Sequence, residues 1–241
     1  MTQSTAATSD TAQSNSHIAI QAQNVTLSLG EGDARVDILK GIDLSIDAGN
    51  TVALLGPSGS GKSSLMAILS GLERATSGTV NIAGADFGKM NEDELAVARR
   101  GRVGIVLQAF HLLPTMTAHE NVAVPLELDG SSDPFSIAAE ELSAVGLGDR
   151  LGHYPTQLSG GEQQRVAIAR AMASRPSIIF ADEPTGNLDG ATGEIIIELL
   201  FERQKATQAT LLMITHDPEL AKRCDRIIEL RDGLIERDSA A

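Results

Sequence analysis

The chain has 241 residues, of which 42% are hydrophobic and 21% charged, and its formal net charge is −13. This length and composition fit a globular protein, and the acidic balance argues against general binding to nucleic acid. The single cysteine, Cys224, excludes an internal disulfide, and no apolar run approaches the roughly 18 residues needed to span a bilayer.

Residues 1–16 are almost all small or polar, so we expect a disordered tail. They have neither the basic start nor the apolar run of a secretory signal. The remainder, residues 17–238, is expected to form a single domain. Residues 18–29 alternate as a strand does, a glycine-rich turn follows, and residues 36–39 and 41–46 resume the extended pattern. This opening predicts an antiparallel β layer beside a core strand.

The stretch from Thr51 to Leu69 has the order strand, glycine-rich turn and helix that a phosphate-binding loop requires. Its glycines let backbone N–H groups turn inward around a polyphosphate, and the helix that follows points its positive end at the same anion. Lys62 would reach the β- and γ-phosphates, and the Ser63 hydroxyl would ligate Mg²⁺. The predicted phosphate contacts are Gly56, Pro57, Ser58, Gly59, Ser60, Gly61, Lys62, Ser63 and Ser64.

Residues 77–176 predict short strands followed by a largely helical region. A strand at 77–84 and a helix at 91–100 lead to a buried strand at 103–107, which ends at Gln108. The pattern from about residue 115 to 173 is helical, and we expect a helical subdomain inserted between two core strands. Ser159 and Glu162 have the spacing of a capping box, which predicts that a helix starts there.

The last third of the chain alternates buried strands with helices. Strands are expected at 177–183, 210–214 and 227–230, and helices at 192–203 and 218–223. Continuously apolar strands are covered on both faces, as in a parallel sheet. The expected fold is therefore α/β, with a mostly parallel core sheet.

Four polar side chains follow predicted strands, at the edge where parallel sheets bind ligands. Alone, each has an ordinary alternative, as surface, turn or structural residue. Together with the phosphate loop, they suggest phosphoryl transfer. Asp182 would hold Mg²⁺, Glu183 would be the general base, Gln108 would approach the metal and the attacking water, and His216 would contact the γ-phosphate.

Residues 158–165 have no predicted role in the phosphate site of their own chain. Its serine and glycines start a helix, which makes a second anion-binding N-terminus. In a head-to-tail pair of copies, Ser159 and Gly161 of one subunit would contact the γ-phosphate held by the other, with two ATP molecules in the interface. The alternative is an ordinary capped helix.

With these motifs in order, residues 18–236 resemble the nucleotide-binding subunit of an ATP-binding-cassette (ABC) transporter. The resemblance implies a P-loop NTPase fold of ABC ATPase type, and ATP with Mg²⁺ as the ligands. It adds Gly160 and Asp189 to the contacts across a homodimer. The matching motifs are Walker A (56–63), the Q-loop Gln108, the signature (158–165), Walker B (178–182), the catalytic Glu183, the D-loop (187–189) and the switch His216.

Within the family, the chain resembles the LolD/MacB branch, whose permeases are FtsX-like. This implies an ATPase held at the cytoplasmic face of the bacterial inner membrane through such a permease, acting on hydrophobic or lipid-like compounds. Phe110, Leu112, Leu113 and Met116 crowd an expected surface loop, and such apolar density often marks a contact site. We therefore expect the permease to dock beside Gln108, on the surface formed by residues 109–117 and the helical insertion; the alternative is that these apolar residues seat the insertion on the core.

The chain departs from the family pattern at the adenine. The family usually stacks an aromatic ring on the base ahead of Walker A, but no Phe, Tyr or Trp precedes Phe87, and Leu29 takes that position. Leu29 would cover the base without π-stacking.

Other candidate functions are a P-loop enzyme outside the family, a soluble ABC-type ATPase that regulates a non-transport complex, and a non-hydrolysing interaction module. The signature stretch disfavours the first, and the intact Lys62, Asp182, Glu183 and His216 disfavour the last.

Overall fold

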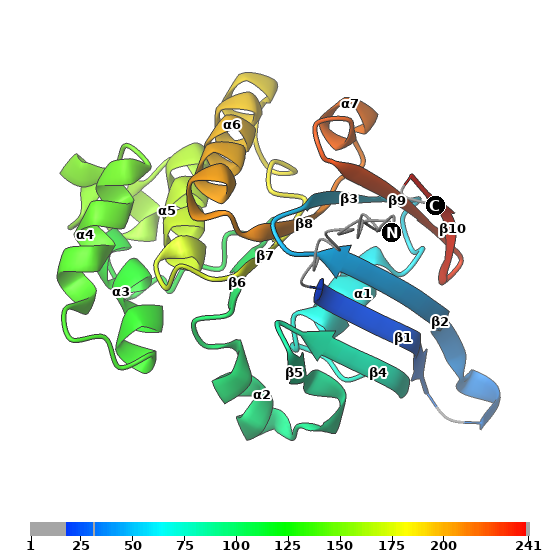
Figure 1. Ribbon diagram of the computed structural model, residues 1–241. Coiled ribbons are helices and arrows are strands. Elements are labelled where there is room, and N and C mark those ends of the chain that lie inside the picture. The colour runs from blue at the N-terminus through cyan, green and yellow to red at the C-terminus, as the bar shows by residue number, and fades with distance from the viewer. Residues whose placement is uncertain (1–17, 31, 240–241) are drawn as a thin grey trace, which may run out of the picture.

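The computed structural model describes residues 18–30 and 32–239, so the expected tail at 1–16 lies outside the described residues. The described residues form two sheets, with helices between and around them (Figure 1). Within this part of the chain, no helix combines the length and apolarity needed to cross a membrane.

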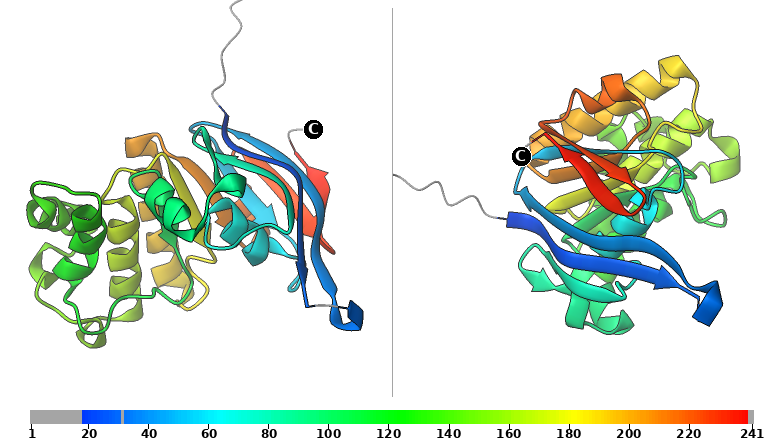
Figure 2. Two further views of the ribbon diagram at one scale, coloured as in Figure 1. Left: turned by 90° about the horizontal axis from the view of Figure 1, so that it is seen from below. Right: turned by 90° about the vertical axis from the view of Figure 1, so that its right-hand side faces the viewer.

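The first sheet is antiparallel, with the strand order β2-β1-β4-β5. A long hairpin of β1 (Ile18–Leu29) and β2 (Val36–Asp47) forms most of it, and its tip projects from the body of the molecule (Figure 2). The strands β4 (Ser77–Ile82) and the two-residue β5 (Ala85–Asp86) complete it. The expected antiparallel layer is thus confirmed, with the two runs at 36–39 and 41–46 joined into one strand.

The second sheet is mostly parallel, as expected, with the order β10-β9-β3-β8-β7-β6. Five neighbouring strands run parallel, and only β10 pairs antiparallel, with β9. Their buried apolar runs fit strands that are covered on both faces. The strands are β3 (Thr51–Leu55), β6 (Val103–Val106), β7 (Ile178–Asp182), β8 (Thr210–Ile214), β9 (Arg226–Arg231) and β10 (Leu234–Asp238).

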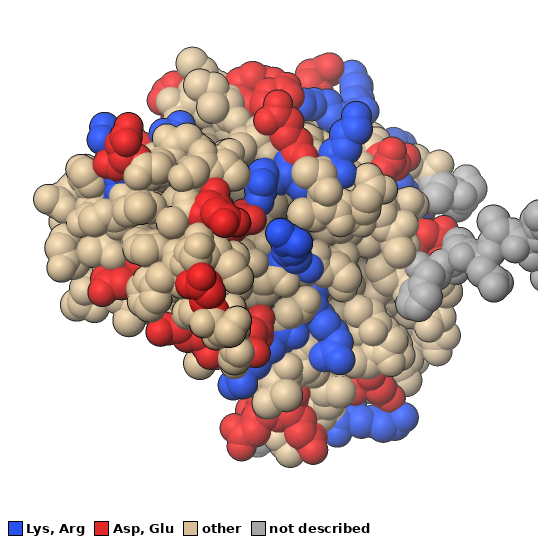
Figure 3. All heavy atoms as spheres, turned by 60° about the vertical axis from the view of Figure 1, so that its left-hand side comes forward, with Lys and Arg blue, Asp and Glu red and all other residues tan. Residues whose placement is uncertain are grey.

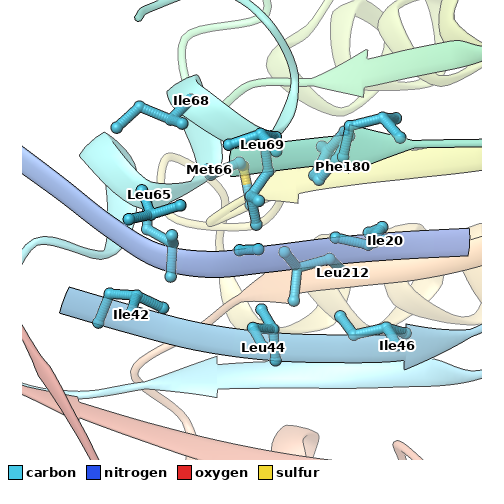
Figure 4. Packing of buried hydrophobic residues seen from close by; sticks show 14 of the residues in the cluster. Ile20, Ile42, Leu44, Ile46, Leu65, Met66, Ile68, Leu69, Phe180 and Leu212 are labelled. Carbon is cyan, nitrogen blue, oxygen red and sulfur yellow. The ribbon is translucent and has the colours of Figure 1, made fainter. Parts of the chain in front are cut away.

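Helix α1 (Lys62–Leu69) is packed between the two sheets. Figure 4 shows its side chains among residues of both, with Ile20 and Ile42 from the antiparallel sheet and Phe180 and Leu212 from the parallel one. All four of these residues are fully buried or nearly so. The start of α1, which follows the phosphate loop, is therefore held by the main core.

Three helices form a separate group beside β6 and β7, at the left of Figure 1. These are α3 (Ala118–Leu128), α4 (Pro134–Ala144) and α5 (Gly160–Met172), which bury a core of their own that includes Val122, Leu142 and Val166. The expected capping box at the start of α5 is present, since the Ser159 side chain accepts from the Glu162 N–H and the Glu162 carboxylate accepts from the Ser159 N–H.

Of the remaining helices, α6 (Gly190–Thr207) and α7 (Pro218–Ala221) pack on the core sheet, and α2 (Glu92–Arg99) lies beside β5 in Figure 1. Helix α2 begins at a capping box formed by Asn91 and Glu94, as its sequence predicts. Helix α6 is capped by Asp189 and runs further at both ends than the expected 192–203, while α7 is a single turn. Short 3-10 turns lie at Gly32–Ala34, Phe87–Lys89, Gly148–Arg150 and Pro155–Gln157.

Candidate active site

The phosphate loop is enclosed by backbone from both sheets. Gly56 has φ +148°, and a Cβ there would lie 2.1 Å from the carbonyl oxygen of Leu230 on β9. Gly61 has φ +101°, and its Cβ would lie 2.8 Å from the Leu39 side chain on β2. Only glycine fits at either position, because any other residue would add both strain and a collision. The loop is therefore built by close approach as well as by turn geometry.

The side chain of Lys62 lies in the mouth of this loop. Its Nζ donates to the carbonyl oxygens of Gly56 and Pro57, each at 2.9 Å, and the residue is only 9% exposed. Gly61 caps α1 without a side-chain hydrogen bond, so no side chain occupies the cap position at this helix N-terminus. A buried ammonium beside a helix N-terminus is an anion site.

Asp182 and Ser63 form the second part of the site. The Ser63 hydroxyl lies close enough to the Asp182 carboxylate to favour its charged form. Burial raises the pKa of Asp182, and the negative charge of Glu183 raises it further. The Ser63 hydroxyl and the positive charge of Lys62 lower it, but the net shift is upward. A partly buried carboxylate beside a hydroxyl is a donor set that suits Mg²⁺, which takes few protein ligands and completes its shell with water and phosphate. Among the described residues, no three acidic, histidine or cysteine side chains are grouped so that they could hold a metal ion by themselves.

Glu183 and His216 face each other at the ends of neighbouring strands. Strands β7 and β8 pair Asp182 with Ile214, and the Glu183 N–H donates to the Ile214 carbonyl at 3.1 Å. Glu183 adopts φ +42°, an uncommon conformation for a residue with a side chain. His216 Nδ1 lies 3.6 Å from the Glu183 carboxylate, and the His216 side chain is 74% exposed. A carboxylate beside an accessible imidazole can accept and pass a proton.

Gln108 follows β6 and contacts the D-loop. Its Nε2 lies 3.4 Å from Asn187 Oδ1, its carbonyl accepts from Asn187 Nδ2 at 2.9 Å, and its side chain packs on Gly186. The two residues that follow Ala109, Phe110 and His111, both have positive φ. The contacts of Gln108 are thus with the turn after Glu183.

Arg170 of α5 holds the backbone of Phe110 and His111 in place. Its guanidinium donates to the His111 carbonyl at 2.7 Å and to the Phe110 carbonyl at 2.8 Å. Burial lowers the pKa of Arg170. A partly buried guanidinium that bonds two consecutive carbonyls therefore ties the loop after Gln108 to α5.

The signature residues contact their own D-loop and α6. The Ser159 hydroxyl donates to Glu162 at 2.9 Å, and hydrogen bonds from the Ser159 N–H and hydroxyl hold the pKa of Glu162 below its usual range. A Cβ on Gly160 would lie 3.3 Å from Leu188, and one on Gly161 2.5 Å from Thr192. The structure therefore does not bring the Ser159 hydroxyl to the phosphate loop of the same chain.

Two further predicted residues are exposed. Asp189 caps α6 by accepting the Thr192 N–H at 3.0 Å, and that bond lowers the pKa of its carboxyl. Leu29 ends β1, opposite Val36 in the register, and the two side chains belong to residues that are 51% and 56% exposed. They form an uncovered apolar pair on the hairpin whose second strand packs on Gly61.

The expected docking loop has one exposed large apolar side chain, that of Leu113. Leu113 is 43% exposed, whereas Phe110, Leu112 and Met116 are partly buried, with Leu112 packed on the core of the α3–α5 group. The buried Asn121 of α3 shapes this loop, since its side chain makes hydrogen bonds to the backbone of residues 113, 116 and 117. On the face drawn in Figure 3, basic side chains form a short band among acidic ones, and no broad basic surface appears.

Three residues of this region escaped the sequence reasoning: Gln164, Arg170 and Asn121. Gln164 is fully buried, and its Nε2 donates to the Pro184 carbonyl at 2.7 Å. A signal existed for it, because Gln164 interrupts the buried stripe of α5 that contains Gly161 and Ile168, and a polar residue at an apolar position calls for a partner. No sequence pattern identifies the partners themselves.

Comparisons with known proteins match this geometry. A family model for ABC transporters matches residues 39–186. The chain is 47% identical over 222 residues to the ABC transporter ATP-binding protein YbbA of Escherichia coli (strain K12), covering 91% of this chain and 97% of that one. It is 45% identical over 218 residues to the lipoprotein-releasing system ATP-binding protein LolD of Legionella pneumophila (strain Paris), covering 90% and 96%. The expected family and its LolD/MacB branch are confirmed, and YbbA is among the similar relatives.

The fold is similar to solved cassettes. A dimeric structure of the ATP-binding cassette MJ0796 in a post-hydrolysis state, bound to ADP and Pi, superposes with a TM-score of 0.84 at 40% identity. The match covers 91% of this chain and 97% of that one. The predicted P-loop fold of ABC ATPase type is therefore confirmed.

Proposed function

The chain belongs to the ABC transporter family and is an ABC-type ATP hydrolase, and we propose that two copies hydrolyse ATP between them to drive an FtsX-like permease. One observation carries the hydrolytic part of the proposal. The carboxyl ends of β3, β7 and β8 bring together Lys62 in the phosphate loop, the neighbouring Ser63 and Asp182, and the facing Glu183 and His216. Phosphoryl transfer needs these parts together.

The residues divide the work by their chemistry. The N–H groups of the loop and of the first turn of α1 bind the phosphates, and Lys62 exchanges its two carbonyl partners for phosphate oxygens. Glu183 accepts the proton of the attacking water, and His216, beside it, holds that water and the γ-phosphate in line. Gln108, on the loop after β6, contacts Asn187 of the D-loop, so a movement of either loop reaches the other. Ser63 and Asp182 would hold Mg²⁺, which when bound neutralises charge on the phosphates.

Each site is completed by a second copy. Ser159, the cap of α5, is exposed, and the N–H groups at the start of a helix can bind an anion. The likeness to a cassette that is dimeric with ADP and Pi bound supports a homodimer in which the signature residues 159–161, with Asp189, contact the partner's nucleotide. Two nucleotides then lie in one two-fold interface.

The partner is an integral-membrane permease, which places the ATPase at the cytoplasmic face of the inner membrane. The resemblance to LolD, a subunit of a lipoprotein-releasing system, supports hydrophobic or lipid-like cargo. The docking site is the loop 109–117, with the exposed Leu113 at its surface. This segment adjoins Gln108, so a partner seated on it also contacts the loop that reaches the D-loop.

Two variants of one residue test the chemistry. Glu183→Gln removes the general base but leaves the phosphate loop intact, so we expect ATP to bind and a stable ATP-bound dimer to accumulate, with multiple-turnover hydrolysis lost. Glu183→Asp retains a carboxylate and should keep a residual rate. Undiminished turnover by Glu183→Gln would remove Glu183 from this role.

Mixed dimers test the shared site. Neither a Lys62→Ala chain nor a Ser159→Arg chain should hydrolyse ATP alone, but in a mixed dimer both defects can fall on one composite site and leave the other intact. We expect activity to return on mixing, and to rise faster than linearly with protein concentration. A monomeric form that hydrolyses ATP at the full rate would exclude the shared site.

The docking loop is tested by an exposed substitution. Leu113→Asp should abolish recovery of the ATPase with the permease in membrane vesicles and spare hydrolysis, because Leu113 lies outside the site. The matched control is Ile195→Asp on α6, where an equally apolar residue is 57% exposed. If Leu113→Asp still binds the permease, or if the chain co-purifies only with soluble proteins, the docking proposal is wrong and the soluble regulatory alternative gains.

A further inference from the structure

The first turns of α5 rest on the segment that follows the proposed general base in the same chain. Gly160 lies against Leu188, and Gly161 lies against Thr192 so closely that a Cβ would come within 2.5 Å of its methyl group. One turn further, Gln164 contacts Pro184. Residues 160, 161 and 164 share one helix face, so this face is packed along residues 184–192.

The contact of Gln164 is a buried hydrogen bond. Gln164 is 0% exposed, and its Nε2 donates to the Pro184 carbonyl oxygen at 2.7 Å. That carbonyl can only accept, so the amide nitrogen must face it. The Gln164 Oε1 is buried and has no hydrogen-bond partner among the described residues.

Pro184 directly follows Glu183 and has no N–H to donate. Glu183 is itself held by two backbone hydrogen bonds, since its N–H donates to Ile214 at 3.1 Å and its carbonyl accepts from Gly186 at 3.0 Å. Gln108 contacts the turn further along, at Gly186 and Asn187. Glu183 itself has φ +42°, which is unfavourable for a residue with a side chain and must be imposed by its surroundings. The Gln164 amide holds the one polar group of Pro184, and so helps to impose this conformation.

Stability alone does not account for a glutamine here. A fully buried amide with an unused carbonyl carries a desolvation penalty that an aliphatic side chain of similar size would avoid. The gain from the Pro184 bond is set against that penalty. The remaining reason for an amide at position 164 is the geometry that it gives to residues 183 and 184.

We propose that Gln164 is a positioning residue that ties the general base of each subunit to the signature helix of the same subunit. The inference rests on the proposed dimer. There, the signature of a subunit contacts the ATP held by its partner, whereas Glu183 of that subunit acts on its own ATP. Gln164 joins these two parts within one chain, so that engagement of the signature at one site adjusts the base at the other.

The first test compares two buried glutamines. Gln164→Leu removes the bond to Pro184, while Gln204→Leu removes a similar bond, 2.7 Å from Gln204 Nε2 to the Ala209 carbonyl, at the far end of α6. For Gln164→Leu, we expect kcat to fall roughly tenfold or more, as a displaced catalytic group costs. The KM for ATP and ATP-dependent dimerisation should be unchanged, and the Hill coefficient should fall toward one. Gln204→Leu should lose stability and keep kcat and cooperativity.

The second test locates the effect within the dimer. Ser159→Arg inactivates the signature of the chain that carries it, and hence the partner's site. With Gln164→Leu on that same chain, the one working site contains the weakened Glu183 turn, and we expect the slow rate. With Gln164→Leu on the opposite chain, the working site has an intact Glu183 turn, and we expect the rate of the Ser159→Arg mixed dimer alone.

The outcomes separate the inference from the proposed function. Equal rates in the two mixed dimers, or a slow rate only in the opposite-chain arrangement, would overturn it, since Gln164 would then act through the signature it belongs to. If Gln164→Leu does not fold, Gln164→Asn, which is too short to reach Pro184, takes its place in both tests. Hydrolysis by unaltered protein that is linear in concentration would instead refute the dimer itself.

Discussion

Asn121 offers a direct test of how the docking loop is held, because one side chain supports most of its backbone. The residue is 1% exposed. Its Oδ1 accepts from the Leu113 N–H at 2.8 Å, and its Nδ2 lies within 3.1 Å of the carbonyl oxygens of Leu113, Met116 and Thr117. The change Asn121→Leu keeps the volume of the side chain and removes all four contacts.

The magnitude follows from these contacts. A hydrogen bond contributes roughly 0.5–1.5 kcal/mol net, so four would sum to about 2–6 kcal/mol. Three of them share one NH₂ group with two hydrogens, and the loop borders solvent, so water can replace some partners. We therefore expect the low end, a loss of about 2–3 kcal/mol in the free energy of unfolding. With a urea dependence of about 2–3 kcal/mol/M, the midpoint should shift by about 1 M.

Urea unfolding and hydrogen exchange measure the two parts of this prediction. The Leu113 amide should exchange much faster in Asn121→Leu, while ATP hydrolysis per folded molecule stays near the parent value, because no contact of Asn121 reaches the site. Asn121→Asp is the matched control, since it keeps the acceptor and loses the two N–H donors. A midpoint within about 0.2 M of the parent, or an unchanged Leu113 exchange rate, would refute the reasoning.

Three further predictions concern the base, the phosphate loop and the cysteine. Leu29→Tyr adds a ring worth about 0.5–1.5 kcal/mol, so ATP should bind roughly threefold to tenfold more tightly at an unchanged saturated rate; unchanged affinity would mean that Leu29 does not face the base. Gly56→Ala should abolish ATP binding in a filter or fluorescence titration, because its Cβ would lie 2.1 Å from the Leu230 carbonyl, whereas Gly59→Ala, with nothing within 4 Å, should be milder. Burial, with a smaller contribution from Asp225, raises the pKa of Cys224 from 9.0 to about 11, so a thiol reagent at pH 8 should label it only in urea. The folded state then binds this proton more tightly than the unfolded state does, so the stability it contributes is full below pH 9.0 and is lost as the pH rises to about 11; rapid labelling of the native protein at pH 8 would contradict this.

The sequence predicts best those elements whose burial leaves a plain pattern. Strands β3, β7 and β8 are apolar throughout because helices or the second sheet cover both faces, and they lie within the expected ranges. Strand β10, with the sequence Leu-Ile-Glu-Arg-Asp, was not predicted, because an exposed edge strand that pairs only with β9 needs no apolar run. The start of α6 was placed too late, because two glycines in its first turn hide a helix that Asp189 caps.

In the candidate active site, too, some features could be predicted from the sequence and others could not. Motif residues could be named because phosphate and metal chemistry restrict residue types at fixed spacing. The contacts among them depend on segments that are distant in sequence. Arg170 bonds carbonyls 59 and 60 residues away, and Gln164 bonds one 20 residues away. No local pattern encodes such pairs, because any buried donor could meet any nearby carbonyl.

The Arg170 contact makes α5 a rigid connection between the loop after Gln108 and the signature residue Ser159. Eleven residues separate Arg170 from Ser159, a span of about 16 Å along a helix. At one end, the guanidinium is pinned to two carbonyls of the loop after Gln108, and at the other, Ser159 forms the tip. A displacement of that loop that preserves the two bonds also displaces α5, and with it the contacts of Gly161 and Gln164 along residues 184–192. A small movement of the loop after Gln108 is thus transmitted along α5 to Ser159, and the length of the helix sets the distance over which it acts.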